Sequence, residues 1–209
     1  AGASGGYIDK LGYPFCRGRM FDTLEEDKGQ YEDVADIFWA TGACMAVRNS
    51  VYHEHTGLDA DFFAHMEEID LCWRIKRSGY RIMVQPQSVV YHVGGGTLSK
   101  SNPHKTFLNF RNGLELLTKN LPSNKLVATI LIRMILDGVA AFKFLTSGQP
   151  RDFWAVIRAH LAYYGRLNST LKKRDGNYSL SNELYRNSVV VEYFLNGKKR
   201  FTDLDSGKF

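Results

Sequence analysis

The hydrophobic pattern changes period twice within the first half of the chain, and this alternation constrains the fold more than any other feature. Residues 36–47, DIFWATGACMAV, form an apolar run typical of a strand. Residues 62–80 carry apolar side chains at helical spacing and end in Gly79 followed by Tyr80. Residues 81–93 predict two short strands broken at a proline. A strand, helix, strand order predicts an α/β fold.

The segments on either side have different characters. The beginning of the chain carries Gly, Pro and charge without sustained periodicity, which predicts an arm or loop. The second half predicts helices and then a polar linker, after which an Asn196-Gly197 pair between apolar segments predicts a β-hairpin. The predicted regions are an arm at 1–35, an α/β segment at 36–120, an amphipathic helical region at 121–168, and a linker with a terminal hairpin at 169–209.

Charge divides the chain into two unlike halves. Residues 1–100 hold 10 Lys and Arg against 14 Asp and Glu, a net charge of −4, whereas residues 101–209 hold 17 against 8, a net charge of +9. The acidic half suggests carboxylates gathered for cations or for acid and base chemistry, and the basic half suggests phosphates, nucleic acid or an anionic membrane. The three cysteines form no CxxC pair, which disfavours a disulfide framework or structural zinc and suits a reducing compartment.

The long apolar segment 125–146 contains the charged residues Lys125, Arg133, Asp137 and Lys143. At 100° per residue these four fall within an arc of about 120°, which leaves a broad apolar face. Charges in its interior argue against a membrane-spanning helix. Packing of the apolar face on its own domain is the first expectation, and contact with a lipid surface is the alternative.

The densest group of chemically active residues is the run HMEEIDLCWR at positions 65–74. Adjacent Glu67 and Glu68 diverge by about 100° on a helix, so one is expected to act on a substrate and the other to support it. Asp70 and Arg74 are four residues apart and can form an ion pair. A solvated acidic face is the alternative interpretation. The aromatic residues nearby argue against it, because apolar surroundings raise the pKa of a carboxyl and suit it to act as a base.

His92 ends an apolar strand directly before Gly94-Gly95-Gly96. A lone histidine is more often a packed or surface residue than a ligand. A strand end that opens into glycines is nevertheless a place where ligands meet backbone, and imidazole commonly binds divalent transition metals. His92 is therefore a candidate metal ligand.

Several short motifs follow one another along residues 36–120. They are Trp39-Ala40-Thr41-Gly42-Ala43-Cys44-Met45, Gly57-Leu58-Asp59 with Phe62-Phe63, Glu67-Glu68-Ile69-Asp70-Leu71-Cys72-Trp73-Arg74 with Gly79-Tyr80, Pro86 and Val90-Tyr91-His92-Val93-Gly94-Gly95, and Phe110-Arg111-Asn112. In this order the motifs resemble the second half of a family 2 glycosyltransferase of the bacterial rhamnosyltransferase kind. The resemblance implies a partial GT-A fold, followed here by a helical region and a terminal β-hairpin.

The resemblance also implies roles for individual residues. The family's Glu-Asp pair corresponds to Glu67-Glu68, and its second member is the usual base that deprotonates the acceptor hydroxyl. Glu68 stands there in place of the commoner Asp and reaches one methylene further, while Glu67 and Asp70 complete the catalytic group. The remaining implied roles are substrate binding by Trp39, Thr41, Gly42, Ala43 and Arg74, and metal coordination by His92.

Such enzymes invert the configuration at the transferred sugar, take a nucleotide-sugar donor and use a divalent metal, Mn²⁺ or Mg²⁺. The nucleotide-binding half, with the Asp-x-Asp that holds the metal, belongs upstream of Trp39, where only 38 residues stand. Asp59-Ala60-Asp61 matches the Asp-x-Asp pattern, but its position predicts turn and cap chemistry instead. We therefore expect a C-terminal part of a longer transferase that is inactive alone, binds nucleotide sugar weakly, and meets the metal only with the missing half.

Acceptors of this family are glycans or lipid-linked glycans used in cell-envelope polysaccharide synthesis. The resemblance thus implies a cytoplasmic protein that is peripheral on the inner face of the cytoplasmic membrane. It favours an anionic membrane surface over nucleic acid as the partner of the basic half, where no nucleic-acid reading motif is found. The alternative is a non-catalytic, membrane-associated or partner-binding module that has kept the fold.

Overall fold

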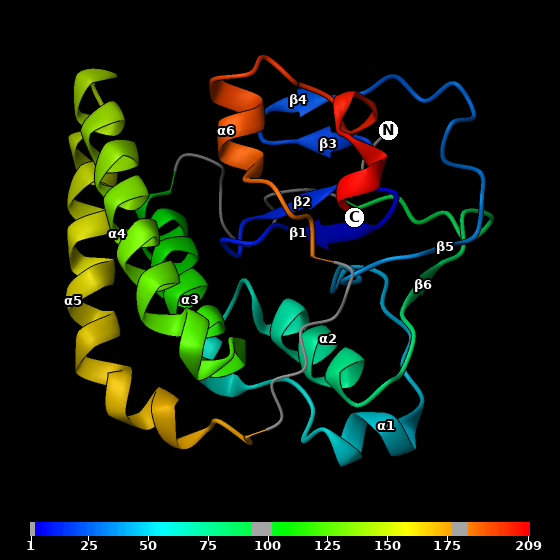
Figure 1. Ribbon diagram of the computed structural model, residues 1–209, viewed down its shortest axis with the longest axis horizontal. Helices are drawn as coiled ribbons and strands as arrows, with labels where there is room; N and C mark the ends of the chain where they lie inside the picture. The colour runs from blue at the N-terminus through cyan, green and yellow to red at the C-terminus, as the bar shows by residue number, and fades with distance from the viewer. Residues whose placement is uncertain (1–2, 93–101, 177–183) are drawn as a thin grey trace. The chain divides into compact units, whose positions relative to one another are not determined.

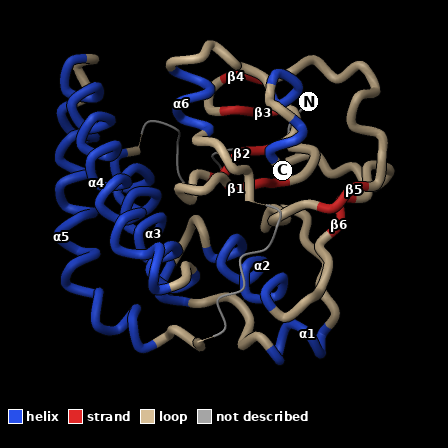
Figure 2. The backbone as a smooth tube through the Cα atoms, in the orientation of Figure 1, coloured by secondary structure: helices blue, strands red, loops and turns tan. Residues whose placement is uncertain are grey.

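The structure is a computed structural model that describes residues 3–92, 102–176 and 184–209 (Figure 1). The chain divides into two compact units. The sheet unit comprises Ala1–Leu58, Glu68–Tyr91 and Ser179–Phe209, and the helical unit comprises Asp59–Glu67 and His92–Tyr178. Strands and helices are both present, as an α/β fold requires, and helix predominates (Figure 2).

The sheet unit begins with a four-stranded antiparallel sheet in the order β1-β2-β3-β4. The strands are β1 (Gly6–Ile8), β2 (Pro14–Cys16), β3 (Arg19–Met20) and β4 (Thr23–Leu24). Gly12 and Gly18 have φ values of 76° and 81°, a conformation that favours glycine, and they turn the chain beside β2. The arm or loop expected over residues 1–35 thus contains a small sheet between residues 6 and 24. Strands this short show too few alternations for their period to be read.

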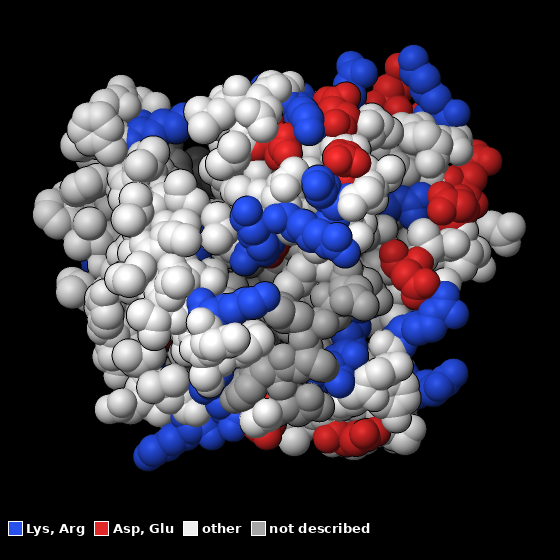
Figure 3. Space-filling view, in the orientation of Figure 1, with Lys and Arg blue, Asp and Glu red and all other residues white. Residues whose placement is uncertain are grey.

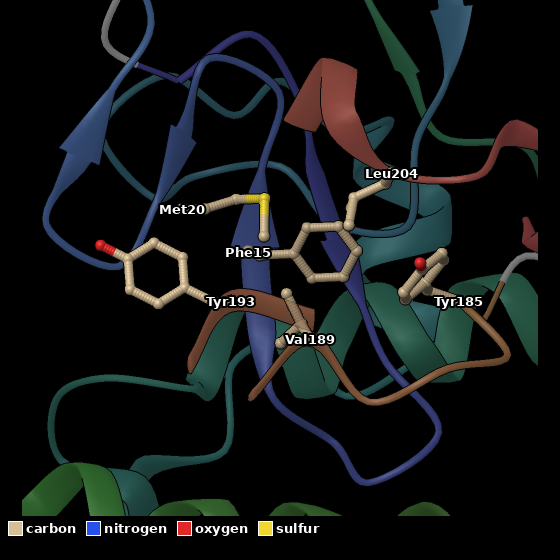
Figure 4. Close-up of a cluster of buried hydrophobic side chains, with 6 residues drawn as sticks. All are labelled: Phe15, Met20, Tyr185, Val189, Tyr193 and Leu204. Carbon is tan, nitrogen blue, oxygen red and sulfur yellow. The ribbon is translucent and has the colours of Figure 1, made fainter. Parts of the chain in front are cut away.

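The core of the sheet unit joins the beginning of the chain to its end. Phe15 and Met20 of the sheet are buried with four residues from the C-terminal segment, and their side chains point toward one another in Figure 4. The four are Tyr185, Val189, Tyr193 and Leu204. Tyr185 also continues the backbone pairing, since its N–H donates to the carbonyl of Ile8 at 3.0 Å.

The terminal hairpin predicted around Asn196-Gly197 is wrong, because the segment before it forms helix α6 (Val189–Phe194). Val189 and Tyr193 are four residues apart and share the buried face, so burial at helical spacing overrides the β-branched run. Gly197, at φ 71°, turns the chain after the helix. Two short 3₁₀ helices follow, η2 (Phe201–Asp203) and η3 (Ser206–Lys208).

The strand, helix, strand segment is recognisable but shorter in its strands than predicted. Within the described residues, the segments 36–47 and 81–93 contribute one short antiparallel strand pair, in which Asp36 lies opposite Met83, and Trp39 forms an isolated bridge with Gly6. Between these strands the helix expected over residues 62–80 begins only at Glu67. The elements are β5 (Ala35–Asp36), α1 (Asn49–Glu54), the 3₁₀ helix η1 (Ala60–Phe62), α2 (Glu67–Arg77) and β6 (Met83–Val84).

The helical unit is built from three long helices, as the sequence predicts. They are α3 (Pro103–Asn120), α4 (Ser123–Thr146) and α5 (Pro150–Lys172). The side chain of Asn102 caps α3 by accepting a hydrogen bond from the N–H of His104 at 2.9 Å, and Pro103 suits the first helical position. Helix α5 packs against both α3 and α4.

Helix α4 turns its charged side inward. Arg133 and Asp137 are buried, with Arg133 Nε 3.7 Å from Asp137 Oδ1 and His160 Nε2 of α5 3.1 Å from Asp137 Oδ2. Gly113 of α3 leaves room for this arrangement, since a Cβ there would stand 3.0 Å from Arg133 Nη2. The apolar side of α4 is consequently exposed, which reverses the packing expected for residues 125–146.

One buried carboxylate ties the first hairpin to α6. Asp9 Oδ1 accepts hydrogen bonds from the N–H groups of Leu11 (2.9 Å) and Tyr13 (2.8 Å), and its Oδ2 accepts one from Val189 N–H at 2.8 Å. We predict that Asp9→Ala lowers the free energy of unfolding by about 3 kcal/mol, because three backbone donors lose a charged partner. Urea denaturation measures the loss. Asp22→Ala, a substitution at an exposed position, serves as the control. Equal free energies of unfolding for the two variants would contradict the prediction.

Candidate active site

The segment that leads into α2 is backbone-strained. Phe63, His65 and Met66 have φ values of 66°, 67° and 76°, in the left-handed region that residues with a side chain rarely adopt. Each such residue costs on the order of 1 kcal/mol, and strain of this kind persists only where the surroundings fix the backbone. We call residues 59–66 the strained loop. It ends at Glu67, the first residue of α2.

A side-chain amide from α3 holds the strained loop. Asn112 is fully buried, and its Nδ2 donates to the carbonyl oxygens of Phe62 (3.0 Å), Ala64 (2.8 Å) and His65 (2.7 Å). Its Oδ1 accepts a hydrogen bond from Arg111 Nε at 2.9 Å, and Arg111 Nη2 donates to Phe62 O at 3.1 Å. We call this arrangement the Asn112 clasp. It gives the Arg-Asn pair of the last sequence motif a defined structural task.

Ion pairs fix the beginning of the same loop. Asp59 Oδ2 lies 2.8 Å from Lys119 Nζ, and Asp59 Oδ1 lies 2.7 Å from Lys173 Nζ. Burial acts to raise the pKa of Asp59, but the hydrogen bonds from the two lysines outweigh it and hold the pKa well below its usual range. Asp59 Oδ1 also accepts from the N–H of Asp61 at 3.1 Å, which confirms the turn and cap chemistry predicted for Asp59-Ala60-Asp61.

The two glutamates open α2 and are both half-buried. The first-turn N–H groups of an α-helix carry partial positive charge, which favours carboxylates at this position. Glu67 Oε2 is buried and accepts no hydrogen bond from any residue that the structure describes. Glu68 stands close to the buried thiol of Cys72. Burial raises the pKa of that thiol to about 11, the Ala40 backbone opposes the rise, and the Glu68 charge adds to it.

His65 belongs to this site and was not among the residues chosen from the sequence. Burial and the nearby charge of Lys105 lower the pKa of His65, whereas the Glu67 carboxylate acts to raise it. The only sequence signal was its position just ahead of the glutamate pair. The φ of 67° at His65 could not be predicted from the sequence, because the strained backbone depends on partners in another helix.

Asp70 and Arg74 are committed to one another. Asp70 is fully buried, and Arg74 Nε donates to its Oδ2 at 2.9 Å, as their spacing predicted. Arg74 also donates to the carbonyls of His55 and Gly57, which fastens α2 to the segment after α1. These contacts give both residues a structural role. The catalytic role of Asp70 and the substrate-binding role of Arg74 stay predictions.

The segment predicted to line the substrate pocket begins with a fixed tryptophan. Trp39 Nε1 donates to the carbonyl of Tyr7 at 2.8 Å, and its ring lies so close to Gly6 that a Cβ there would stand 2.2 Å from it. Thr41 and the exposed Gly42 and Ala43 follow in a turn closed by a hydrogen bond between Cys44 N and Thr41 O of 3.0 Å. Trp39 is thus anchored, and the turn after it presents backbone to solvent.

The predicted metal ligand is isolated in the part of the chain that can be described. His92 is exposed, and Gly94, Gly95 and Gly96 lie outside the described residues. Within residues 3–92, 102–176 and 184–209, no group of three His, Cys, Asp or Glu side chains could hold a metal ion. His92 stays a predicted ligand, and the metal stays a prediction.

Comparisons with known proteins relate part of the chain to glycosyltransferases. It is 33% identical over 56 residues to an N-acetylglucosaminyl-diphospho-decaprenol L-rhamnosyltransferase of Mycobacterium tuberculosis, covering 27% of this chain and 18% of that protein. It is 24% identical over 141 residues to the low-salt glycan biosynthesis hexosyltransferase Agl10 of Haloferax volcanii, covering 67% of this chain and 41% of that protein. The chain thus spans less than half the length of either relative. No family model and no solved structure matches it.

The Asn112 clasp predicts a specific loss of stability. We expect Asn112→Ala to lower the free energy of unfolding by about 3 kcal/mol, because carbonyls of the strained loop lose their donor. Asn112→Asp should be at least as damaging, since carboxylate oxygens would face carbonyl oxygens. Asn109→Ala, a change at a half-buried position of the same helix, is the control. Thermal unfolding that ranks Asn112→Ala with this control would contradict the prediction.

The groups around His65 predict how its pKa compares between the wild-type protein and the Glu67→Gln variant. NMR should find the imidazole pKa below the usual value near 6.5. Glu67→Gln should lower it further, because the carboxylate that favours the imidazolium is lost. Since the folded protein favours neutral His65, its contribution to stability is complete above the unfolded pKa and is lost as the pH falls below it. Glu26→Gln, a substitution at an exposed position, is the control. An unchanged or raised His65 pKa in Glu67→Gln would refute the arrangement.

Proposed function

We propose that the chain is the acceptor-side part of an inverting family 2 glycosyltransferase with the GT-A fold. It transfers a sugar from a nucleotide-sugar donor to a glycan or lipid-linked acceptor in cell-envelope polysaccharide synthesis. The observation that carries the proposal is the placement of Glu67 and Glu68 at the start of α2, directly after a strained loop held by Asn112. Backbone strain of this kind clusters at functional sites. The partial similarity to two glycosyltransferases supports the same reaction class.

In the proposed reaction Glu68 is the general base. Its carboxylate accepts the proton of the acceptor hydroxyl while that oxygen attacks the anomeric carbon, on the face opposite the departing nucleoside diphosphate. The bond from the anomeric carbon to the diphosphate breaks as the new glycosidic bond forms, so the configuration inverts. Glu68 is half-buried and lies near the buried thiol of Cys72.

Glu67 has a supporting role in this proposal. About 100° of helix rotation separates it from Glu68, so the two carboxylates cannot both face the acceptor oxygen. Its charge acts on His65, which places Glu67 on the side of the strained loop. The Trp39 ring and the turn containing Thr41, Gly42 and Ala43 are proposed to contact the sugar, with the exposed turn supplying backbone hydrogen bonds.

A cytoplasmic position at the inner face of the membrane fits a lipid-linked acceptor. The exposed apolar side of α4 favours a second candidate function, a non-catalytic module that binds a membrane or a partner. The two functions differ in one respect that can be measured, since only a transferase depends on the Glu68 carboxylate.

Substitution of the glutamates tests the proposal in the protein made from the complete reading frame. A donor screen comes first, and transfer to a lipid-linked acceptor is then measured by release of nucleoside diphosphate. We expect Glu68→Gln to lower kcat by about 10² to 10⁴-fold with donor binding nearly unchanged, because the amide cannot accept the proton. Glu67→Gln, the matched change one residue away, should cost far less. A wild-type kcat for Glu68→Gln would remove Glu68 as the base. A wild-type protein that turns over none of the donors in the screen would favour the non-catalytic module.

A further inference from the structure

The outer side of α4 is apolar over nearly its whole length. Its exposed apolar residues are Val127, Leu131, Ile132, Ile135, Val139, Phe142 and Leu145. At 100° per residue they fall within an arc of about 140°, and from the first to the last they span about 27 Å. Figure 3 shows the surface over α4 as almost entirely uncharged, with Lys and Arg at its margins. An exposed apolar patch of this extent marks an interaction site.

Helix α5 extends the same kind of surface. Trp154, Ile157, Leu161 and Tyr164 are exposed, and they share one side of the helix. Helices α4 and α5 pack together within the helical unit. We call these exposed residues of α4 and α5 the apolar platform.

The burial of charge between the helices explains why the platform faces outward. Arg133 and Asp137 of α4 and His160 of α5 are packed together. Rotating α4 about its axis to bury its apolar side would break these contacts and expose the charged groups. None of the helices in the described ranges is both long and apolar enough to cross a bilayer.

The charges that border the platform have one sign. Five basic residues of the two helices are exposed, namely Lys125, Lys143, Arg151, Arg158 and Lys172. The acidic residues of these helices lie elsewhere, since Asp137 is buried and Asp152 accepts a hydrogen bond from Thr106. An apolar strip edged by Lys and Arg complements acyl chains and anionic headgroups together.

We propose that the apolar platform seats the protein on an anionic membrane surface, with Trp154 at the headgroup level. The alternative of a second copy of the chain is disfavoured by charge, because a self-complementary pairing would bring basic margins together. The inference rests on the membrane contact included in the proposed function and names the surface that makes it. It uses no residue of the candidate active site, so its failure would leave the proposed transfer reaction standing.

Vesicle flotation tests the proposal with purified protein. Vesicles of phosphatidylcholine alone are compared with vesicles that also contain phosphatidylglycerol. We expect about tenfold more protein to float with the anionic vesicles and 0.5 M NaCl to reduce the difference. The tryptophan emission should shift to the blue, and Trp154→Phe should lose most of this shift. The paired substitution Lys143→Gln with Arg151→Gln should lower binding to anionic vesicles only.

A double substitution on the platform provides the structural control. Ile135→Glu with Val139→Glu changes two side chains that are 68% and 64% exposed, so the fold should be kept, which circular dichroism verifies. This variant should lose flotation, whereas Leu195→Glu with Val34→Glu, at exposed positions of the sheet unit, should keep it. Wild-type protein that floats with neither vesicle overturns the proposal, as does undiminished flotation of Ile135→Glu with Val139→Glu. A dimer in sedimentation that this variant disperses, without vesicle binding, would assign the platform to a second copy.

Discussion

The side-chain amide of Asn112 is the constraint on which the candidate site depends. It donates to three carbonyl oxygens of a loop whose residues Phe63, His65 and Met66 adopt left-handed backbone conformations. The free energy contributed by the hydrogen bonds of one buried amide is comparable to the backbone strain of those residues. The strained conformation and the hydrogen bonds therefore depend on one another. The loop leads directly into Glu67, the first residue of α2.

The same logic of buried polar groups organises the rest of the helical unit. Arg133, Asp137 and His160 satisfy one another between α4 and α5, and this determines which side of α4 faces outward. Asp9 does comparable work in the sheet unit, where one carboxylate joins the first hairpin to α6. In each case a few directional contacts decide how apolar surfaces are distributed, and on α4 the result is an exposed apolar platform available to a membrane.

The sequence predicted elements whose signals are local. The helical character of the second half and the pairing of Asp70 with Arg74 follow from periodicity and spacing. It could not reveal the clasp, because Asn112 lies about fifty positions from the carbonyls it holds. It misassigned α6 as a hairpin, because β-branched residues before an Asn-Gly pair mimic a strand. It also reversed α4, since a helical wheel shows that charges cluster without showing whether they face solvent or a buried partner. The GT-A fold and the transfer chemistry stay proposals that rest on motifs and partial similarity.

The central proposal is that the Asn112 clasp holds the strained loop before Glu67 in the conformation that the proposed transfer needs. Steady-state kinetics of Asn112→Ala in the complete transferase test it most directly, at a temperature where the variant is folded. The account predicts that kcat falls by about tenfold or more while the donor KM stays within about twofold, because a displaced base affects the transition state more than the bound donor. A folded Asn112→Ala protein with wild-type kcat would contradict the claim.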